Sequence, residues 1–448
     1  MRILIVGAGN TGRNLATKLC QMHHDIVVVD PNQTRLDKLE GEADLLTICG
    51  SGCSPAILAK AEISKADLMI AVSNRDEINI LACQIAHAAK VKHKVARISD
   101  TSLSRTDWLD WQQLGVDLMI SHKEETANEI AQIVQNPGAL EIIELLDGRI
   151  KVVGIRVDER SRLLGGTLMD IHEADLFGRL RFIAVMRNEE LLVPRGDTRF
   201  MVGDDIYVAL RPADLPAMLA WAYPQKPSYG KVVIAGGGDM GMELARNLDA
   251  SSLSTTLLEQ DSARADFCAS ELNKVLVLNG DASDQETLAN AGIGHDTAFI
   301  AITGDEELNI VSCILANKLG AGFTLAQVTK PEYVPIIKTL SLLDRVVSPH
   351  LSMINAILHF VRGRNVKSAA LLHKLPGELL QIDVPAKHRW IGRSIRDIKA
   401  PKGALIVTAL RDGKIHVPTG EYQISASDQL VIFCKPETVE RIEKAFHR

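Results

Sequence analysis

The sequence predicts an α/β fold with two doubly wound, parallel-sheet domains, each followed by a small α+β domain, as a tandem duplication. A glycine motif with G-x-G-x-x-G spacing occurs twice, as GAGNTG from residue 7 and as GGGDMG from residue 236. Each motif follows a short apolar strand and opens an amphipathic stretch, which is the order of a βαβ unit. The likeness between the two halves continues far beyond the glycines, as expected of an internal repeat.

Length and composition set the first limits. A chain of 448 residues is too long for one hydrophobic core. Its 46% hydrophobic and 24% charged residues are ordinary for a folded globular protein. A net charge of −6 and only 4% aromatic residues argue against a nucleic-acid partner, which would favour basic and stacking surfaces. No apolar run reaches the ~18–20 residues needed to span a bilayer, so we expect a soluble, cytoplasmic chain.

The seven cysteines favour neither a disulfide framework nor a metal site. Their number is odd and they are spread along a long chain. Cys49 and Cys53 stand four residues apart, but no second cysteine pair or histidine cluster completes a metal-ligand set. We expect buried thiols instead.

The first half shows the expected elements in order. Apolar strands at 3–6 and 25–30 flank the first helix, and the second of these strands ends on Asp30. Their apolar character without polar alternation predicts a parallel sheet that is covered on both faces. Further strands are expected near 45–48, 68–72 and 95–98, with helices near 54–62 and 75–90.

The second half repeats this order. Asp30 and Glu259 are 229 residues apart, as are Gly7 and Gly236. The segment DLMIAVSNRDEINILAC (67–83) matches TAFIAITGDEELNIVSC (297–313). Conserved spacing over this length predicts the same sheet twice.

A smaller repeat follows each sheet domain. The segment 161–171 resembles 388–398, and Asp204 and Asp428 are among several matched positions that are 224 residues apart. Short alternating strands with one helix predict a compact α+β unit. The predicted domains are 1–137, 138–222, 230–366 and 367–448, with a proline-containing linker at 223–229.

The glycine motifs are typical of nucleotide binding. Gly7 allows the tight strand-to-helix turn, Gly9 lets the main chain approach a pyrophosphate, and Gly12 lets the helix pack closely on the sheet. Asp30 stands where a carboxylate can accept hydrogen bonds from a ribose diol, which favours NAD(H) or another adenine nucleotide over NADP. The alternative is that the glycines serve helix–strand packing alone. The second motif supplies Gly236, Gly238, Gly241 and Glu259.

Two arginines are candidates for phosphate contacts. Arg97 ends the predicted fifth strand, at the sheet edge where ligands of such folds bind. Its counterpart in the second half is Gln327, which lacks the charge. Arg13 lies on the first helix, where it could either contact a phosphate or remain solvated. Arg13-Asn14 replaces the Lys-Ser/Thr of a Walker motif, which argues against phosphoryl transfer.

No catalytic constellation is recognisable. The sequence has no H-E-x-x-H and no G-x-S-x-G motif. His295 precedes a predicted strand and is interpreted as a turn residue. The alternatives that remain open are a ligand sensor, an NAD-dependent oxidoreductase that acts on a small metabolite, and a scaffold with degenerate sites.

GAGNTG, Asp30, the segment AVSNRDEIN and the small trailing domain together resemble the RCK (KTN) family of regulators of potassium conductance. The resemblance covers essentially the whole chain. It implies large domains that bind NAD(H) or ATP/ADP, a homo-oligomeric ring (a dimer or tetramer) on the cytoplasmic face of the inner membrane, and a membrane-embedded potassium transporter partner of the TrkH/TrkG type. It implies no catalytic residue. The nucleotide-binding positions that it implies are Gly7, Gly9, Asn10, Thr11, Gly12, Asp30, Arg97, Gly236, Gly238, Asp239, Met240, Gly241, Glu259 and Asp281.

The two halves depart differently from this family. The family's G-D-A after the third strand is kept in the second half, where it includes Asp281, but the first half has Ser51 at that place. We therefore expect the two sites to differ in ligand preference or affinity. The helices at 124–135 and 353–361 have apolar positions spaced for packing on another helix. They are expected to exchange between the two large domains, the alternative being packing on their own sheets.

Overall fold

The computed structural model describes residues 1–22, 24–104, 106, 108–146, 148–169, 176, 178–188, 190–224, 229–330, 333, 336–337, 342–362, 369–371, 377–398, 400–401 and 403–446. The chain forms two compact units, and each takes segments from both halves of the sequence. Met1–Ala131 joins Tyr229–Leu358 in the first unit, and Gln132–Ser228 joins His359–Arg448 in the second. The first unit holds the two parallel sheets and the second unit the two antiparallel sheets.

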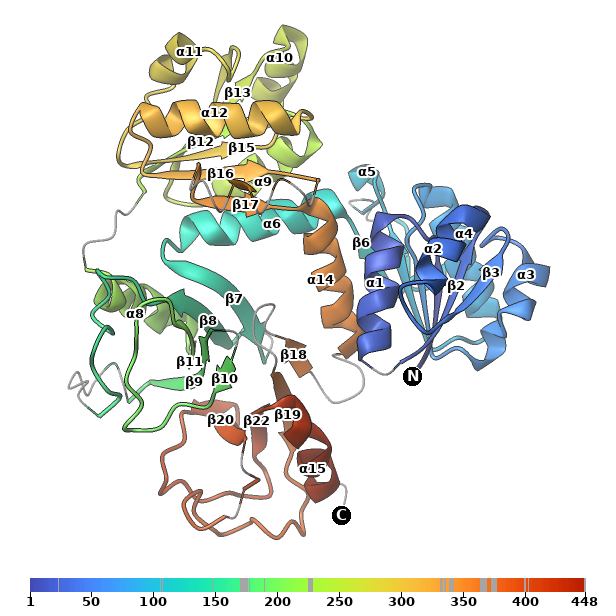
Figure 1. Cartoon of the computed structure of the whole chain (residues 1–448), viewed down its shortest axis with the longest axis vertical. Coiled ribbons are helices and arrows are strands. Elements are labelled where there is room, and N and C mark those ends of the chain that lie inside the picture. The colour runs from blue at the N-terminus through green and yellow to red at the C-terminus, as the bar shows by residue number, and fades with distance from the viewer. Residues whose placement is uncertain are drawn as a thin grey trace. The chain divides into compact units, whose positions relative to one another are not determined.

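The first large domain contains a six-stranded parallel sheet with the order β3-β2-β1-β4-β5-β6. The strand order reverses between β1 and β4, which opens a crevice at the carboxyl ends of the strands. Figure 1 shows this domain in blue. Its strands are β1 (Arg2–Val6), β2 (Asp25–Asp30), β3 (Leu46–Cys49), β4 (Leu68–Ala71), β5 (His93–Arg97) and β6 (Leu118–Ile120), and its helices include α1 (Asn10–Gln21), α2 (Gln33–Glu40), α3 (Pro55–Lys60), α4 (Asp76–Ala88) and α5 (Thr101–Ser104).

The second large domain repeats this topology with the order β14-β13-β12-β15-β16-β17, again parallel. The predicted pair of doubly wound domains is therefore confirmed. The strands are β12 (Lys231–Ala235), β13 (Ser254–Glu259), β14 (Leu276–Asn279), β15 (Thr297–Ala301), β16 (Phe323–Gln327) and β17 (Arg345–Val347), and the helices include α9 (Asp239–Asp249), α10 (Ser262–Glu271), α11 (Gln285–Asn290) and α12 (Glu306–Lys318).

Burial explains why these segments form strands and helices. The residues of β1 from Ile3 to Val6 are at most 2% exposed, because helices cover both faces of the sheet. On α1, Leu15 and Leu19 lie four residues apart on one face and are fully buried. The carboxyl ends of the strands are thus held on a rigid support.

Two helices connect the large domains. These are α6 (His122–Gln135) and α14 (Pro349–Arg362), and both begin earlier than the sequence predicted. Asn247 of α9 donates a hydrogen bond to Asn128 of α6 over 2.8 Å, and Ser352 of α14 donates one to Glu129 of α6 over 2.7 Å. In Figure 1, α14 runs alongside α1 of the other large domain. The expected helix exchange is confirmed within a single chain.

The second unit contains two antiparallel sheets, with the orders β10-β9-β11-β8-β7 and β18-β19-β22-β20-β21. Each sheet is joined to one helix near its carboxyl-terminal strand, as predicted for the α+β units. The elements are β7 (Ala139–Leu145), β8 (Ile150–Arg156), β9 (Leu180–Arg187), β10 (Glu190–Leu192), β11 (Asp205–Leu210), α8 (Leu215–Ala222), β18 (Ala369–Leu371), β19 (Glu378–Asp383), β20 (Ala404–Arg411), β21 (Lys414–His416), β22 (Gln429–Cys434) and α15 (Pro436–Phe446).

One core and one repeated ion pair hold the small domains. Tyr207 of one sheet and Phe433 of the other belong to the same buried cluster, so the two sheets share apolar surface. The matched Asp204 and Asp428 are buried acceptors for Arg187 and Arg411, with N–O distances of 2.6–2.8 Å. Most of the predicted linker at 223–229 and the end of the repeat at 161–171 lie outside the described residues.

Candidate nucleotide-binding site

A cavity of about 800 Å³ lies at the carboxyl ends of the strands in the first large domain. It sits at the reversal of strand order, the place where open α/β sheets bind ligands. The glycine loop, Asp30 and Arg97 all contribute to its wall, together with His350 from the second half of the chain. Of the predicted first-site residues, the structure brings Gly7, Gly9, Asn10, Thr11, Asp30 and Arg97 to this cavity.

Backbone conformation and packing explain two of the three glycines of the first loop, Gly7 and Gly12, but not Gly9. Gly7 has φ +109°, a conformation that side chains rarely adopt. A Cβ on Gly12 would lie 1.8 Å from the carbonyl oxygen of Gly7, so this glycine permits the close approach of α1 to the strand. Gly9 differs, because its backbone is extended and a Cβ would have no atom within 4 Å among the described residues beyond its chain neighbours. Neither backbone conformation nor packing therefore explains Gly9, and packing alone does not account for the motif.

The second loop repeats this geometry. Gly236 has φ +112°, and a Cβ on Gly241 would lie 1.9 Å from the carbonyl oxygen of Gly236. Gly238, like Gly9, is extended and faces open space. The duplication has preserved the backbone of the loop in both domains.

Asp30 is held in one orientation by backbone groups. It is 4% exposed, its Oδ2 accepts the N–H of Ala8 over 2.7 Å, and its Oδ1 accepts the N–H of Asn32 over 2.8 Å. Each carboxylate oxygen retains a further lone pair, so the group can still accept hydrogen bonds from a diol. In the second domain Glu259 accepts the N–H groups of Gly237 and Asp261 in the same way, over 2.7 and 2.9 Å.

Arg97 contributes a guanidinium to the cavity wall, and one of its nitrogens is a buried donor. Its Nε is buried and has no hydrogen-bond partner among the described residues. Burial lowers the pKa of this guanidinium, and the charge of nearby Asp76 opposes that shift. A buried donor without a partner is costly unless another group satisfies it. An anionic ligand such as a phosphate fits this position.

Asn79 organises the floor of the site, a role that the sequence reasoning did not assign. Its side-chain oxygen accepts the N–H of Ser73 over 2.9 Å, and its amide donates to the carbonyl oxygens of Ser73 and Arg97 over 3.1 and 2.8 Å. Asn309 repeats this pattern with Thr303 and Gln327. The sequence feature that could have indicated this role is the match of Asn79 with Asn309 inside the repeated segment.

His350 was also missed. It is the second residue of α14, and its Nδ1 lies 3.3 Å from Oγ1 of Thr11, the second residue of α1. Burial and then the charge of Arg97 lower the pKa of His350. The expected helix exchange pointed towards such a contact, but the predicted helix start at 353 excluded this residue. Arg35 and Lys38 of α2 line the same cavity and were missed as well.

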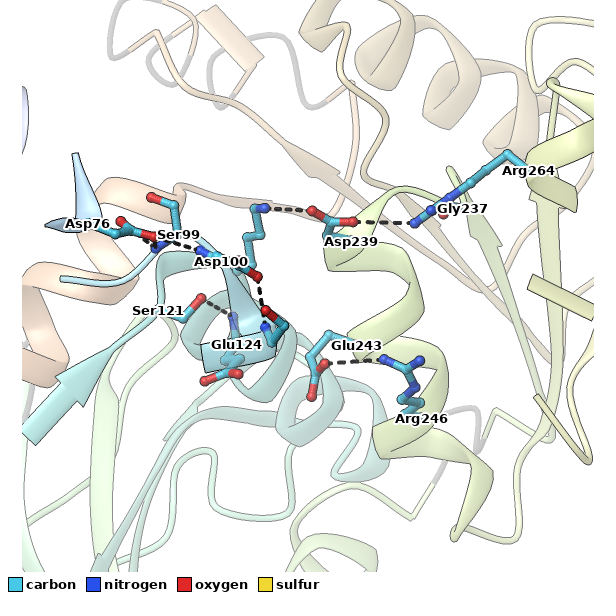
Figure 2. Close-up of polar contacts among 12 residues, drawn as sticks. Asp76, Ser99, Asp100, Ser121, Glu124, Gly237, Asp239, Glu243, Arg246 and Arg264 are labelled. Atoms are coloured by element: carbon cyan, nitrogen blue, oxygen red, sulfur yellow. Dashed lines mark hydrogen bonds and ion pairs between the residues drawn. The ribbon is translucent and has the colours of Figure 1, made fainter. Parts of the chain in front are cut away.

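The second glycine loop carries a carboxylate that the first loop lacks. Asp239, the first residue of α9, is paired with Lys123 of α6 at 2.6 Å and with Arg264 of α10 at 3.3 Å. Figure 2 shows Asp239 at the start of α9 with polar contacts on two sides. Met240 follows Asp239 and corresponds to Thr11. Hydrogen bonding to Lys123 lowers the pKa of Asp239.

Asp281 and Ser51 occupy equivalent turns after the third strand of each sheet. Asp281 accepts the backbone N–H and the hydroxyl of Ser283, both over 2.7 Å, and the side-chain amide of Gln260 over 3.1 Å. The hydroxyl of Ser51 accepts the N–H of Cys53 over 3.2 Å. Serine therefore keeps the turn without the negative charge.

Three further candidates are a second hollow, His295 and Arg13. A hollow of about 880 Å³ is lined by residues at the amino ends of β2 and β3, the edge opposite to the ligand edge. His295 lies in an exposed turn before β15, as interpreted from the sequence. Arg13 lines the main cavity, with a guanidinium nitrogen 3.5 Å from Glu42.

The cysteines are all free thiols, and four of them are buried: Cys83, Cys268, Cys313 and Cys434. The interpretation as buried thiols is thus wrong for Cys49, which is exposed, while Cys20 and Cys53 are half-buried. The described part of the chain contains no group of three or more His, Cys, Asp or Glu side chains placed to hold a metal ion. None of the helices in that part is both long and apolar enough to cross a membrane.

Family models match both halves in the expected order. The TrkA-N domain matches residues 3–122 and 232–349, and the TrkA-C domain matches residues 152–222 and 379–447. The chain belongs to the TrkA family. The TrkA-N matches coincide with the two parallel-sheet domains, and the TrkA-C matches with the two antiparallel ones.

Curated members of the TrkA family align over the whole chain. A Trk system potassium uptake protein TrkA from Haemophilus influenzae is 32% identical over 453 residues, covering 100% of this chain and 98% of the relative. One from Azorhizobium caulinodans is 29% identical over 456 residues, again covering 100% of this chain and 98% of the relative.

Solved structures share the fold of this TrkA-family chain. The GsuK channel bound to NAD superposes with a TM-score of 0.63 at 20% identity, covering all of this chain and 79% of the channel. The GsuK RCK domain gives a TM-score of 0.61 at 19% identity and covers 95% of that domain. At this identity the likeness supports the tandem RCK fold.

Proposed function

We propose that this chain is a regulatory subunit of potassium transport that binds NAD(H), or ATP/ADP, and controls a membrane transporter by conformational change. The family membership and the names of the full-length relatives support this role. We further propose that the chain performs no catalysis. The domain limits 1–137, 138–222, 230–366 and 367–448 belong to the same proposal.

One observation carries the proposed binding. Gly9 is glycine although its extended backbone would suit any residue and, its chain neighbours aside, no atom of the described residues lies within 4 Å of where its Cβ would be. Room beside the N-terminus of α1 is what a pyrophosphate requires, because the free N–H groups of the first helical turn point at it. A ligand that comes close to the main chain is the remaining reason for glycine at this position.

Different residues of the site would contact different parts of the nucleotide. The N–H groups of the turn formed by Gly9, Asn10 and Thr11 would face the pyrophosphate, and the Asp30 carboxylate would face the adenosine ribose diol. Arg97 would satisfy its orphan Nε with a phosphate or ribose oxygen. A bound dinucleotide would act on the protein only through its binding energy, since no residue of this site is proposed to make or break a covalent bond.

The contact of His350 with Thr11 would couple ligand binding to the angle between the two large domains. His350 belongs to the second half of the chain, while the glycine loop belongs to the first. A ligand in this cavity would therefore contact both large domains and favour one angle between them. A differential affinity of about 1–3 kcal/mol for two such angles would shift a gate by roughly 5–150-fold.

The partner is proposed to be a membrane-embedded potassium transporter subunit of the TrkH/TrkG type. The chain would act as a homo-oligomer, a dimer or tetramer, on the cytoplasmic face of the inner membrane. The small domains, with their shared apolar core, would hold neighbouring parts in register. No nucleic-acid partner is proposed, because the net charge is −6.

Co-purification with a candidate potassium transporter subunit, followed by potassium flux in vesicles, tests this function. We expect a stable complex whose flux changes when NADH, NAD, ATP or ADP is added to the side that carries the chain. The vesicles with the membrane subunit alone should not respond to nucleotide. Flux that ignores every nucleotide in the presence of the bound chain would contradict the proposal.

A further inference from the structure

The two exchanged helices deliver matched residues to the two glycine loops. Lys123 and His350 are each the second residue of their helix, and each helix follows the last strand of its sheet. Lys123 reaches Asp239 at the start of α9, and His350 reaches Thr11 at the start of α1. Each loop is therefore met by a side chain from the other half of the chain.

The cations around the second loop are already neutralised by the protein. The Asp239 carboxylate lies 2.6 Å from Nζ of Lys123 and 3.3 Å from a guanidinium nitrogen of Arg264. Nε of Arg264 also donates to the carbonyl oxygen of Gly237 over 2.8 Å, so this side chain lies across the glycine loop (Figure 2). A phosphate that enters the loop must compete with Asp239 for both cations.

The corresponding residues of the first loop make no such bridge. Asn10 stands in place of Asp239 and is uncharged, and Arg35 stands in place of Arg264, both at an offset of 229 residues. The guanidinium of Arg35 makes no hydrogen bond or ion pair within the described part of the chain, and it lines the cavity of about 800 Å³. Arg35 is thus available to an anionic ligand.

We propose that the first residue of each glycine-loop helix decides which domain takes a pyrophosphate-bearing nucleotide tightly. Asn10 leaves the first loop open to an anion. Asp239 adds a negative charge at the mouth of the second loop and holds Lys123 and Arg264, so that loop binds the same ligand more weakly. This inference rests on the proposed function and names the site through which that function operates.

A consequence is that ligand at the second loop would act on the exchanged helix. Lys123 belongs to α6, so displacing it from Asp239 would break a contact between the two large domains. Binding at the first loop would instead add to the contact that His350 makes with Thr11. Ligand at the second loop would thus weaken a contact between the two large domains, whereas ligand at the first loop would strengthen one.

Reciprocal charge exchanges on the full chain test this proposal. We expect Asp239→Asn to raise the affinity of the second loop for NADH by about five- to tenfold at low ionic strength, since removing a carboxylate near a phosphate relieves repulsion. Asn10→Asp should lower the affinity of the first loop by a similar factor. Because Asp239 is 54% exposed, both effects should shrink in high salt.

Blocking variants assign each affinity to its loop. Gly9→Val and Gly238→Val have open space for the side chain in an extended backbone, so they should fold and close the first and second loop respectively. Asp239→Asn is therefore measured in the Gly9→Val chain by titration calorimetry with NADH and with ADP, and Asn10→Asp in the Gly238→Val chain. Asp239→Glu keeps the charge and Asn10→Ala adds none, so neither control should change the affinity by more than about twofold.

The outcomes separate this inference from the proposed function. If the wild-type chain binds neither NADH nor ADP, the proposed function fails and this inference falls with it. If the wild-type chain binds but Asp239→Asn leaves the second loop unchanged, or Asn10→Asp leaves the first unchanged, the inference alone is overturned. A carboxylate in the first turn of a helix interacts favourably with the helix dipole and stabilises the helix, so Asn10→Asp should not lower the melting temperature.

Discussion

The two glycine loops share a backbone and differ in their charges. In both loops the first glycine has a positive φ, the middle glycine faces open space and the last one allows a close helix–strand contact. Around the first loop stand Asn10, Ser51 and Arg97, whereas the second has Asp239, Asp281 and Gln327 at the same places. The second loop has thus gained two carboxylates and lost one guanidinium. Duplication preserved the backbone of the loop and changed the charges around it, and under the proposed function these charges set the affinity for a phosphate.

The small domains show the opposite behaviour, because their repeated ion pair is the same in both copies. Replacing either Asp204 or Asp428 with alanine should lower the free energy of unfolding by about 2–4 kcal/mol, since it removes a buried carboxylate and leaves a partly buried arginine without this partner. Chemical denaturation of the full chain measures this loss. Glu421→Ala is the control, because its pair with Arg396 is 70% exposed on both sides and should contribute less than about 1 kcal/mol. A similar loss of stability in all three variants would show that the two buried ion pairs contribute no more than the exposed one.

This ion pair also predicts an acid limit. Burial alone would raise the pKa of Asp428, but hydrogen bonds from Arg411 and Ser425 outweigh it and the pKa lies below its usual value. The stabilisation is therefore present above the unfolded pKa of about 3.9 and is lost as pH falls through the lower folded pKa. The difference in stability between wild type and Asp428→Ala should accordingly shrink below about pH 4.

The glycine loops should respond to alanine in two ways. Gly12→Ala and Gly241→Ala place a Cβ within 2 Å of a carbonyl oxygen and should destabilise the chain by about 1–3 kcal/mol or more. In Gly9→Ala and Gly238→Ala the added Cβ has open space within the described part of the chain, so these changes should leave the melting temperature unchanged. Thermal melts without ligand measure the difference. Equal melting temperatures for Gly9→Ala and Gly12→Ala would show that the two positions are not under different constraints.

Arg97 and Gln327 allow a reciprocal exchange. Arg97→Gln should weaken NADH binding at the first loop by about tenfold, or about 1.4 kcal/mol. The free energy of unfolding of this variant should stay the same or rise, because the change removes a buried donor that has no partner among the described residues. Gln327→Arg should strengthen binding at the second loop. If Arg97→Gln lowers stability while NADH affinity is unchanged, Arg97 serves the fold and not the ligand.

The smallest expected effect is a pH dependence that belongs to the first loop. In the free protein the pKa of His350 is lowered by burial and by Arg97, so the imidazole is neutral near pH 7. His122, which also faces this group, has a pKa of about 4 and stays neutral above pH 6. A bound phosphate would raise the pKa of His350, so the complex binds an additional proton and affinity rises as pH falls.

We expect NADH affinity at the first loop to be about threefold higher at pH 6 than at pH 8. His350→Gln should flatten this profile, while the second loop, where Lys123 replaces His350, should show none. Calorimetric titrations at the two pH values measure the effect. A profile that persists in His350→Gln would assign the proton to another group.

The sequence predicted those features that depend on local chain order. The glycine loops, Asp30 and the strands that end at them follow from spacing and apolar runs, and the repeat doubled each signal. The roles of His350 and Lys123 depend on which domain an exchanged helix meets, and Arg264 reaches Asp239 from a different helix of the same domain. No local sequence pattern specifies these contacts. The helix starts were predictable in part: Ser121 accepts the N–H of Glu124 over 3.4 Å, an N-cap arrangement that places the helix start before Lys123.

Titration of the full chain with NADH, monitored for both binding and consumption, tests the central claim most directly. The proposed sensor binds NADH saturably, keeps its concentration constant for hours, and loses the tighter site when Gly9 is replaced with valine. Steady consumption of NADH with a small metabolite, or tight binding that survives Gly9→Val unchanged, would contradict the claim that a ligand at the first glycine loop acts by occupancy alone.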